Sequence, residues 1–157
     1  MVAVCGLKKV GKTTLLTNLI PLLRQRGLKI AVIKHDGHDF EPDVPGTDSY
    51  KLRAAGAQGV AVYSAARWLV TKEAVGLTAA DLLGHFSDSD LILLEGGKNS
   101  PYPKIEIFRQ GGAREPVSSP PHLAFCVEGS LSPTGAPLVG LTDYSHLVDL
   151  IIDRLLS

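Results

Sequence analysis

Residues 6–13 read Gly-Leu-Lys-Lys-Val-Gly-Lys-Thr, which is the complete G-x-x-x-x-G-K-[ST] pattern of a phosphate-binding loop. The pattern follows a short apolar run, residues 2–5 (VAVC), which suits a buried strand, and it opens residues 12–26, which we expect to form a helix. In that setting the backbone N–H groups of the loop surround phosphate oxygens, and the helix N-terminus adds the positive end of its dipole. The stretch therefore predicts a site for a nucleoside triphosphate.

The residue types within the loop each have a chemical reason. Gly6 and Gly11 allow the turns and the close backbone approach that side chains would block. Lys12 can reach the β- and γ-phosphates, and the hydroxyl of Thr13 can ligate Mg²⁺. We expect the nucleotide to contact the whole loop and the start of the helix, namely Gly6, Leu7, Lys8, Lys9, Val10, Gly11, Lys12, Thr13 and Thr14.

Composition points to an ordinary globular domain. The chain has 157 residues and is 45% hydrophobic, which excludes a disordered chain and favours a single domain over residues 1–157. Lys+Arg and Asp+Glu both number 16, so no net charge argues for nucleic acid or an acidic membrane as partner. No apolar stretch approaches the roughly 20 residues that span a bilayer, and none resembles a signal peptide. We expect a cytoplasmic protein in which Cys5 and Cys126 are buried free thiols.

Strand-like and helix-like segments alternate along the chain, which predicts an α/β fold of the P-loop NTPase type, with a mainly parallel sheet and helices on both faces. The most hydrophobic strand, residues 90–97, is expected to be central. Apolar and polar residues alternate over 104–109, so we expect one face of that strand to be exposed to solvent. The other expected strands are residues 28–35, which read as covered on both faces, a pair over 59–64 and 67–72, and residues 123–127 and 138–141. The other expected helices are residues 47–55, one opening at Thr78, and one capped by Asp143 or Ser145 that runs to Leu156.

In parallel sheets ligands lie beyond the carboxyl ends of the strands, so residues at those ends are candidates for the site. Glu95 lies near the end of the 90–97 strand, where a P-loop protein usually places its second Mg²⁺-organising group, directly or through water, although Asp is the commoner residue there. Gly96 would let backbone approach a γ-phosphate, and Lys98 follows it. The alternative is that Glu95 is an N-cap-like loop carboxylate.

The segment after the second strand carries several groups suited to phosphate, metal or proton chemistry. Lys34, His35, His38 and Asp39 lie there, and Asp48 and Arg53 follow on the next helix. We treat these as a candidate site for a second substrate or a partner. The alternatives are hydrogen-bonded loop histidines and a solvated helix face, because no Cys or further His lies near enough in sequence to complete a zinc site.

Several blocks in a fixed order resemble the family of molybdopterin-guanine dinucleotide biosynthesis adapter proteins (MobB). They are the phosphate loop with KTTLL and IPLL, followed by VIKHDGHDF, PGTDSYKLRAAGA, RWLV, DLILLEGGK and KIEIFR. Together they span residues 2–109, and the IKH-x-x-HD, PG-x-DSY and LILxEG-x-K segments are specific to this family in a way that the phosphate loop alone is not. Residues from 110 onward match weakly.

The resemblance implies an accessory protein that binds GTP with Mg²⁺, hydrolyses it weakly and assists a guanylyltransferase that joins a guanylyl group to molybdopterin. It further implies a homodimer whose sheets extend across the subunit interface. Thr13 and Glu95 would hold the metal, and residues 34–39 with Asp48 and Arg53 would face the pterin phosphate or the partner. The base-reading residues are not located, since the Asn-Lys-x-Asp motif of common GTPases is absent.

Two other functions fit the same loop. A small-molecule kinase would need a mobile arginine-rich lid, yet Arg109 and Arg114 are the only arginines in the candidate loop region. A metal-insertion GTPase would need a His- or Cys-rich tract, and this chain has five scattered His and two isolated Cys. Slow hydrolysis is expected because neither an arginine finger nor a water-orienting Gln is evident.

Overall fold

The structure is a computed structural model that describes residues 1–156, and its chain divides into two compact units. The first unit comprises Met1–His35 and Ala79–Ser157, and the second comprises Asp36–Thr78. A single domain over residues 1–157 stays a prediction. No helix among residues 1–156 is both long and apolar enough to cross a bilayer.

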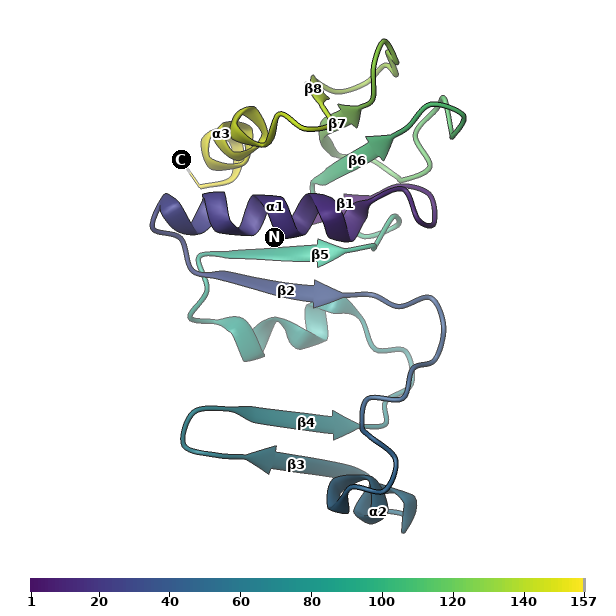
Figure 1. Ribbon diagram of the computed structural model, residues 1–157, viewed down its shortest axis with the longest axis vertical. Helices are drawn as coiled ribbons and strands as arrows, with labels where there is room; N and C mark the ends of the chain where they lie inside the picture. The colour runs from purple at the N-terminus through teal and green to yellow at the C-terminus, as the bar shows by residue number, and fades with distance from the viewer. Residues whose placement is uncertain (157) are drawn as a thin grey trace. The chain divides into compact units, whose positions relative to one another are not determined.

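The first unit is built on a six-stranded sheet in which every neighbouring pair of strands is parallel (Figure 1). Its order is β2-β5-β1-β6-β7-β8, so the strand that precedes the phosphate loop lies in the interior of the sheet. The strands are β1 (Val2–Cys5), β2 (Ile30–Lys34), β5 (Leu91–Glu95), β6 (Lys104–Phe108), β7 (His122–Val127) and β8 (Leu138–Gly140). The helices are α1 (Lys12–Gln25), the 3₁₀ helix η1 (Ala79–Phe86) and α3 (Tyr144–Leu155).

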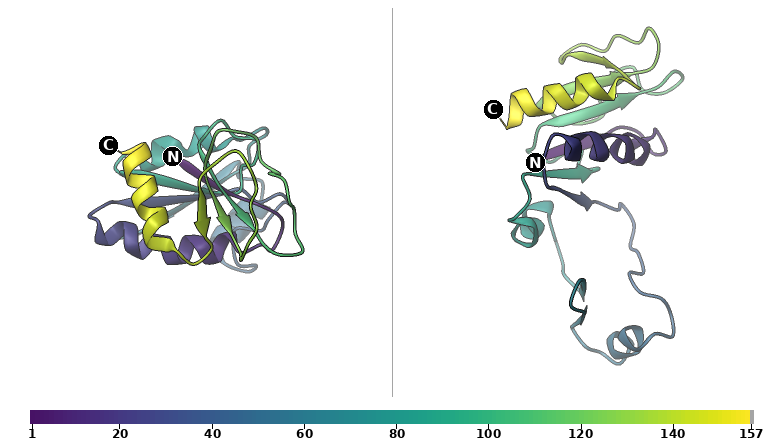
Figure 2. Two further views of the ribbon diagram at one scale, coloured as in Figure 1. Left: turned by 90° about the horizontal axis from the view of Figure 1, so that it is seen from above. Right: turned by 60° about the vertical axis from the view of Figure 1, so that its left-hand side comes forward.

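Helices cover both faces of this sheet, which confirms the predicted α/β architecture. On one face α1 and α3 pack together, and Leu19 and Ile151 join Val4 and Ile105 in the larger core (Figure 2). On the other face η1 supplies Leu83, which packs against a smaller core cluster of Ala3, Cys5, Ile33 and Leu94. Both cysteines are buried and free, as expected.

Four predictions about individual elements need correction, of which the first two concern a helix type and a strand position. The helix expected from Thr78 is a 3₁₀ helix that begins at Ala79. The strand at residues 90–97 is interior but not central, because β1 and β6 occupy the middle of the order. Hydrophobic content identified a buried strand but carried no information on its place among the others.

The second strand, residues 28–35, is not covered on both faces. It forms β2 at the edge of the sheet, where buried and exposed residues alternate and Val32 is 39% exposed. The apolar run of this strand therefore did not mean that both of its faces are covered by other elements.

The expected wet face of residues 104–109 is wrong. Every residue of β6 is buried, including Lys104 at 0% and Glu106 at 1% exposure. The Lys104 ammonium donates to the carbonyls of Ser100 and Tyr102 at 2.6 and 2.9 Å. The Glu106 carboxylate accepts from the backbone N–H groups of Val117 and Ser118 at 2.7 and 3.1 Å. Backbone groups of the adjacent loops form hydrogen bonds with both charged side chains. The alternation of apolar and polar residues in β6 therefore reflects buried hydrogen bonds and not a face exposed to solvent.

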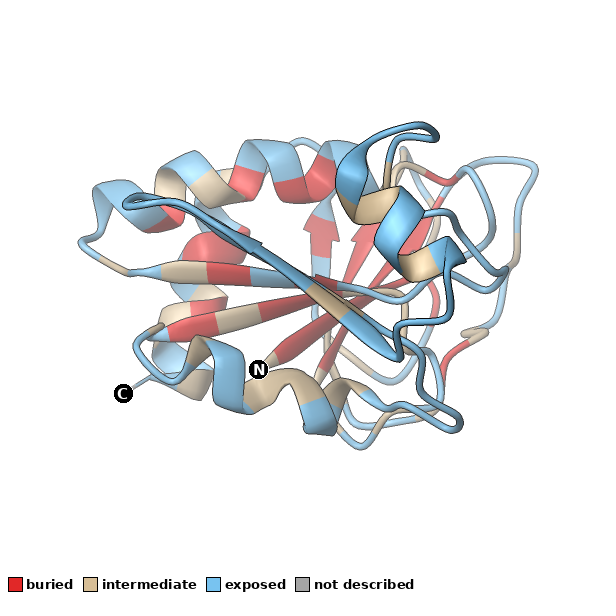
Figure 3. Ribbon diagram, turned by 90° about the horizontal axis from the view of Figure 1, so that it is seen from below, coloured by how far each residue is buried: buried red, intermediate tan, exposed pale blue. Residues whose placement is uncertain are grey.

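The second unit contains the helix α2 (Asp48–Ala54) and the antiparallel strands β3 (Gly59–Tyr63) and β4 (Trp68–Lys72). Thr47 caps α2, and its hydroxyl accepts a hydrogen bond from the N–H of Tyr50 at 3.3 Å, as the sequence predicts. The residues of the hairpin are almost all exposed, in contrast to the buried strands of the first unit (Figure 3).

Candidate phosphate-binding site

The phosphate loop leaves β1 and enters α1 through a backbone that requires its glycines. Gly6 and Gly11 have φ of 134° and 106°. A Cβ on Gly6 would lie 2.9 Å from Val10 Cγ1 and 3.0 Å from the carbonyl oxygen of Ile107, so the position excludes any side chain. Gly11 is the N-cap of α1 and gives it no side-chain hydrogen bond, and the first turn holds no acidic residue. The N–H groups of that turn are thus open to an anion.

Lys12 lies against the loop rather than extending into solvent. Its ammonium donates to the carbonyl of Leu7 at 2.8 Å and to that of Gly6 at 3.4 Å. The positive charge therefore sits over the loop that would surround a phosphate. Phosphate oxygens accept a charge-assisted hydrogen bond more strongly than neutral carbonyls do, so an anion there would compete for this ammonium.

Thr13 and Glu95 meet at the ends of two neighbouring strands. The Thr13 hydroxyl donates to Glu95 Oε1 at 2.8 Å. The pairing of β1 with β5 places Val4 opposite Glu95, so the strand that precedes the loop and the strand that ends in the carboxylate finish at the same edge. The hydroxyl and the carboxylate are hard oxygen ligands of the kind Mg²⁺ prefers, and they fit a metal that takes its other ligands from phosphate and water. Among residues 1–156, no group of three or more His, Cys, Asp and Glu side chains gathers as a metal site.

Three of the residues proposed for a second substrate or partner lie beside Glu95. Lys34 is the register partner of Glu95 across β2 and β5, and the N–H of His35 donates to the Glu95 carbonyl at 2.9 Å. Gly96, with φ of 97°, donates its N–H to Val4 and accepts from Cys5 Sγ at 3.2 Å. The cationic side chain of Lys34 and the ring of His35 are thus carried to the same edge of the sheet as the phosphate loop.

Lys98 follows in the loop after β5 and is exposed. Its carbonyl accepts from the N–H and the hydroxyl of Ser119 at 2.8 and 3.1 Å. This backbone contact ties the loop after β5 to residues 110–121 and leaves the ammonium of Lys98 at the surface.

The remaining candidates, His38, Asp39, Asp48 and Arg53, belong to the second unit, Asp36–Thr78. Arg53 pairs with Glu41 and, at 3.7 Å, with Glu73, and Asp48 pairs with Lys51 at 3.2 Å. The charges of Arg53 and Asp48 are thus engaged within their own unit. A role for these four residues at the phosphate loop stays a prediction.

Arg109 was not predicted as a partner of the loop. It is the first residue after β6, and its Nε donates to the carbonyl of Val10 at 2.8 Å. Its Nη1 lies 3.3 Å from Oε1 of Glu128, and Oε2 of Glu128 accepts from the N–H of Gln110 at 3.1 Å. The rule that picked Glu95, namely to inspect the residues that end each strand, would also have found Arg109.

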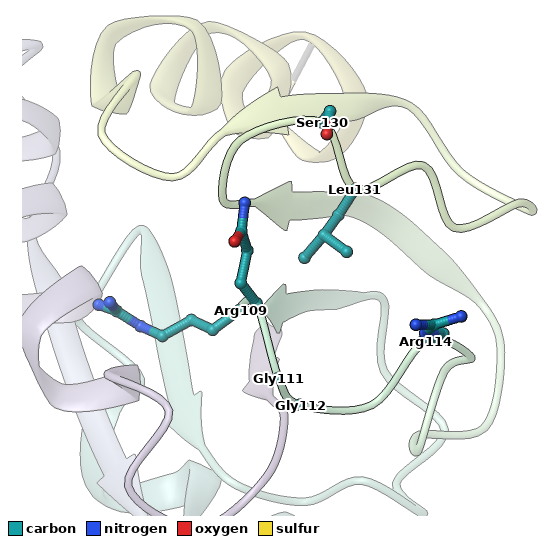
Figure 4. A pocket seen from close by; sticks show the side chains of 7 residues that line it. Arg109, Gly111, Gly112, Arg114, Ser130 and Leu131 are labelled. Carbon is teal, nitrogen blue, oxygen red and sulfur yellow. The ribbon is translucent and has the colours of Figure 1, made fainter.

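A cavity of about 380 Å³ opens next to Arg109, beyond β6 and β7. The Arg109 side chain is directed toward the start of α1, whereas Arg114 lies across the cavity on the other side (Figure 4). The cavity is lined by Arg109, Gln110, Gly111, Gly112, Arg114, Ser130 and Leu131.

The model of the family described as molybdopterin guanine dinucleotide synthesis protein B (MobB) matches residues 1–128. The chain belongs to the MobB family. This confirms the resemblance found in the sequence blocks. The family match ends at Glu128, the residue that pairs with Arg109.

MobB relatives support the match across bacteria. A protein of Escherichia coli (strain K12) named molybdopterin-guanine dinucleotide biosynthesis adapter protein is 45% identical over 111 residues, which are 68% of this chain and 63% of the relative. A protein of the same name from Haemophilus influenzae (strain ATCC 51907 / DSM 11121 / KW20 / Rd) is 37% identical over 113 residues, 70% of this chain and 64% of the relative. This chain therefore matches less than two-thirds of the length of either relative. A crystal structure of Bacillus subtilis MobB is 29% identical with a TM-score of 0.76, and the match covers 98% of this chain and 96% of that one.

Proposed function

We propose that this MobB-family chain binds GTP with Mg²⁺ at the phosphate loop and acts as an accessory protein in the formation of molybdopterin guanine dinucleotide. The observation that carries the proposal is the hydrogen bond between Thr13 and Glu95, because it joins the hydroxyl of the loop to a carboxylate from a neighbouring strand. The names of the relatives, adapter proteins of molybdopterin-guanine dinucleotide biosynthesis, support the pathway.

The phosphates would occupy the concave side of the loop from Gly6 to Thr14. The backbone N–H groups of the loop and the first turn of α1 would donate to phosphate oxygens, and Lys12 would exchange its carbonyl acceptors for the β/γ oxygens. Thr13 and Glu95 would hold Mg²⁺, which supplies charge neutralisation of the triphosphate. The loop thus orients the nucleotide while the metal balances its charge.

Hydrolysis should be weak. The transferred phosphoryl group needs a free cationic side chain to stabilise its developing charge. Arg109 contacts the loop, but its Nε and Nη1 are already bonded to Val10 and Glu128. The nucleotide would therefore serve as a ligand or a delivered substrate rather than as fuel for rapid turnover.

A homodimer is supported by the exposed hairpin of the second unit. Val62, Tyr63, Leu69 and Val70 are between 48% and 85% exposed. A two-stranded hairpin is marginally stable alone, and apolar exposure of this kind marks an interaction surface. We propose that a second copy covers it.

The partner enzyme would be the molybdenum cofactor guanylyltransferase, in the cytoplasm. The cationic side chain of Lys34 and the exposed Lys98, on the loops beside Glu95, suit the phosphate of molybdopterin. These two lysines are therefore the first residues to substitute in a search for pterin binding.

The test is to compare GTP with ATP in binding and single-turnover hydrolysis, and to co-purify the chain with the guanylyltransferase in the presence and absence of GTP. The proposal predicts a preference for GTP, slow turnover and a complex with the enzyme. Rapid ATP consumption on addition of a hydroxyl substrate would instead identify a small-molecule kinase.

A further inference from the structure

Arg109 lies where the winding of the sheet changes direction. From β1 the chain builds β2 and β5 on one side, then crosses to β6, β7 and β8 on the other. In open parallel sheets ligands bind in the crevice at this switch, beyond the carboxyl ends of the strands. The phosphate loop follows β1 on one side of the switch, and Arg109 follows β6 on the other.

The guanidinium of Arg109 is fixed over the end of the phosphate loop. Its Nε bonds to the carbonyl of Val10, and a Cβ placed on Gly11 would lie 3.3 Å from its Nη2 and 4.0 Å from its Cζ. Gly11 is the N-cap of α1, so the guanidinium lies beside the junction between the phosphate loop and the helix. The nucleoside of a nucleotide whose phosphates lie in the loop would extend past this junction. The side chain is still 44% exposed and can be reached by a ligand.

The contacts of Arg109 fix the orientation of its guanidinium. Nε donates to the carbonyl of Val10, Nη1 lies 3.3 Å from Glu128 Oε1, and Glu128 balances the charge. These two contacts leave the other N–H groups of Nη1 and Nη2, and the flat face of the guanidinium, for a ligand. Such a face stacks well on aromatic rings, nucleobases included.

We propose that the guanidinium face of Arg109 stacks against the purine base of the bound nucleotide. The inference rests on the proposed function, because it takes the phosphates to lie in the loop. The carbonyl of Val10 and the carboxylate of Glu128 act as positioning groups that hold the plane in place. One oxygen of Glu128 accepts from Arg109 and the other from the N–H of Gln110, so both contacts hold this carboxylate beside the guanidinium.

Stacking has a consequence that hydrogen bonding to a base edge does not. Every base presents a π-face, so a stacking residue adds affinity without choosing between bases. Loss of Arg109 should therefore weaken GTP and ATP by the same factor and leave the preference between them unchanged. The affinity for a ligand without a base should not change.

The experiment measures dissociation constants with Mg²⁺ for GTP, ATP and inorganic tripolyphosphate on the whole chain. Arg109→Ala should lower the affinity for both nucleotides about tenfold, the loss typical of one stacked base, and leave the affinity for tripolyphosphate unchanged. Arg109→Lys should behave like Arg109→Ala, because an ammonium keeps the charge but has no plane. Arg114→Ala, which removes the same charge across the cavity, is the matched control and should change none of the three.

If Arg109→Ala lowers the affinity for tripolyphosphate as much as that for the nucleotides, the proposal is wrong, since Arg109 would then support the phosphates or the loop itself. Wild-type affinity in Arg109→Lys, or the same loss in Arg114→Ala, would also overturn it and leave only a charge effect. If the chain binds neither tripolyphosphate nor nucleotide, the proposed function is wrong and this inference with it. The same holds if Lys12→Ala leaves the affinities for both ligands unchanged. If Arg109→Ala does not fold, Arg109→Lys with Glu128→Gln gives the same comparison.

Discussion

Thr13 and Glu95 are 82 positions apart in the chain, and the hydroxyl of Thr13 donates a hydrogen bond of 2.8 Å to Glu95 Oε1. Their meeting follows from sheet geometry. The parallel pairing of β1 and β5 sets Val4 opposite Glu95, and the phosphate loop then turns back to place Thr13 in the first turn of α1. Two oxygen ligands for Mg²⁺ are thereby brought together next to the loop that would hold a triphosphate.

Glu95→Gln tests the metal site. The amide keeps the size and one acceptor oxygen but loses the negative charge that attracts Mg²⁺. We expect the affinity for GTP in the presence of Mg²⁺ to fall at least about tenfold, with little change when Mg²⁺ is removed by EDTA. Titration calorimetry in both buffers measures this, with Glu115→Gln as the control. An equal loss in both buffers would mean that Glu95 shapes the loop instead of holding the metal.

The phosphate loop and the sheet were predictable because their signals are local. Gly6, Gly11, Lys12 and Thr13 form a fixed pattern between a strand and a helix, and the strand ends then directed attention to Glu95. The resemblance of the sequence blocks to MobB is confirmed by the family match over residues 1–128.

What was missed depends on tertiary structure that the sequence pattern does not encode. Lys104 and Glu106 looked like a solvated face, because no local pattern shows that the loops after β5 and β6 fold back to satisfy them. Arg109 was noted only as one of two arginines in the candidate loop region, because its bond to Val10 spans 99 residues and leaves no local pattern. The edge position of β2 depends on strand order, which hydrophobicity does not encode.

Glu106→Gln tests the anchor of residues 110–121. The carboxylate accepts from two backbone N–H groups, of Val117 and Ser118, and an amide presents a donor to part of that set. Leaving buried donors unmatched should lower the free energy of unfolding by about 1–3 kcal/mol. Urea denaturation measures it, and protease cleavage within residues 110–121 should accelerate. Glu115→Gln in the same loop should leave the urea midpoint unchanged; an identical shift in both variants would contradict the anchor.

Alkaline pH should destabilise the fold through its two thiols. Burial raises the pKa of Cys5 to about 11 and the pKa of Cys126 to about 12, from the ordinary thiol value of 9.0. Above pH 9 the unfolded chain releases these protons and the folded chain keeps them. The free energy of unfolding should therefore fall by up to about 1.4 kcal/mol per pH unit for each thiol between pH 9 and 11.

Burial lowers the pKa of Lys104, and this acts with the opposite sign. Just below its ordinary pKa of 10.5, the unfolded chain holds that proton more tightly than the folded one, which offsets part of the loss. Cys126→Ala isolates the thiol contribution, since its packing cost does not vary with pH. The slope of stability against pH should become shallower in this variant. A wild-type slope would show that Cys126 does not titrate as its burial implies.

Val70→Asp tests the dimer surface. Val70 is 49% exposed on β4, and a buried carboxylate at an interface between copies would be left without a partner. We expect the variant to sediment as a monomer at concentrations where the wild type is a dimer. Val75→Asp, the same change at a fully exposed position outside the hairpin, should remain dimeric. A monomeric wild type would contradict the proposal directly.

The central claim is that the loop after β1 holds a triphosphate, and Lys12→Ala tests it most directly. Binding of GTP, GDP and ATP with and without Mg²⁺ should be measured on wild type and variant, together with the urea midpoint of each. Because the ammonium would donate charge-assisted hydrogen bonds to the β/γ oxygens, GTP affinity should fall about ten- to a hundredfold. Stability should fall by only about 1 kcal/mol, the net loss expected from its hydrogen bonds to the loop carbonyls. Unchanged GTP affinity in Lys12→Ala would contradict the account and place nucleotide binding, if any, elsewhere on the chain.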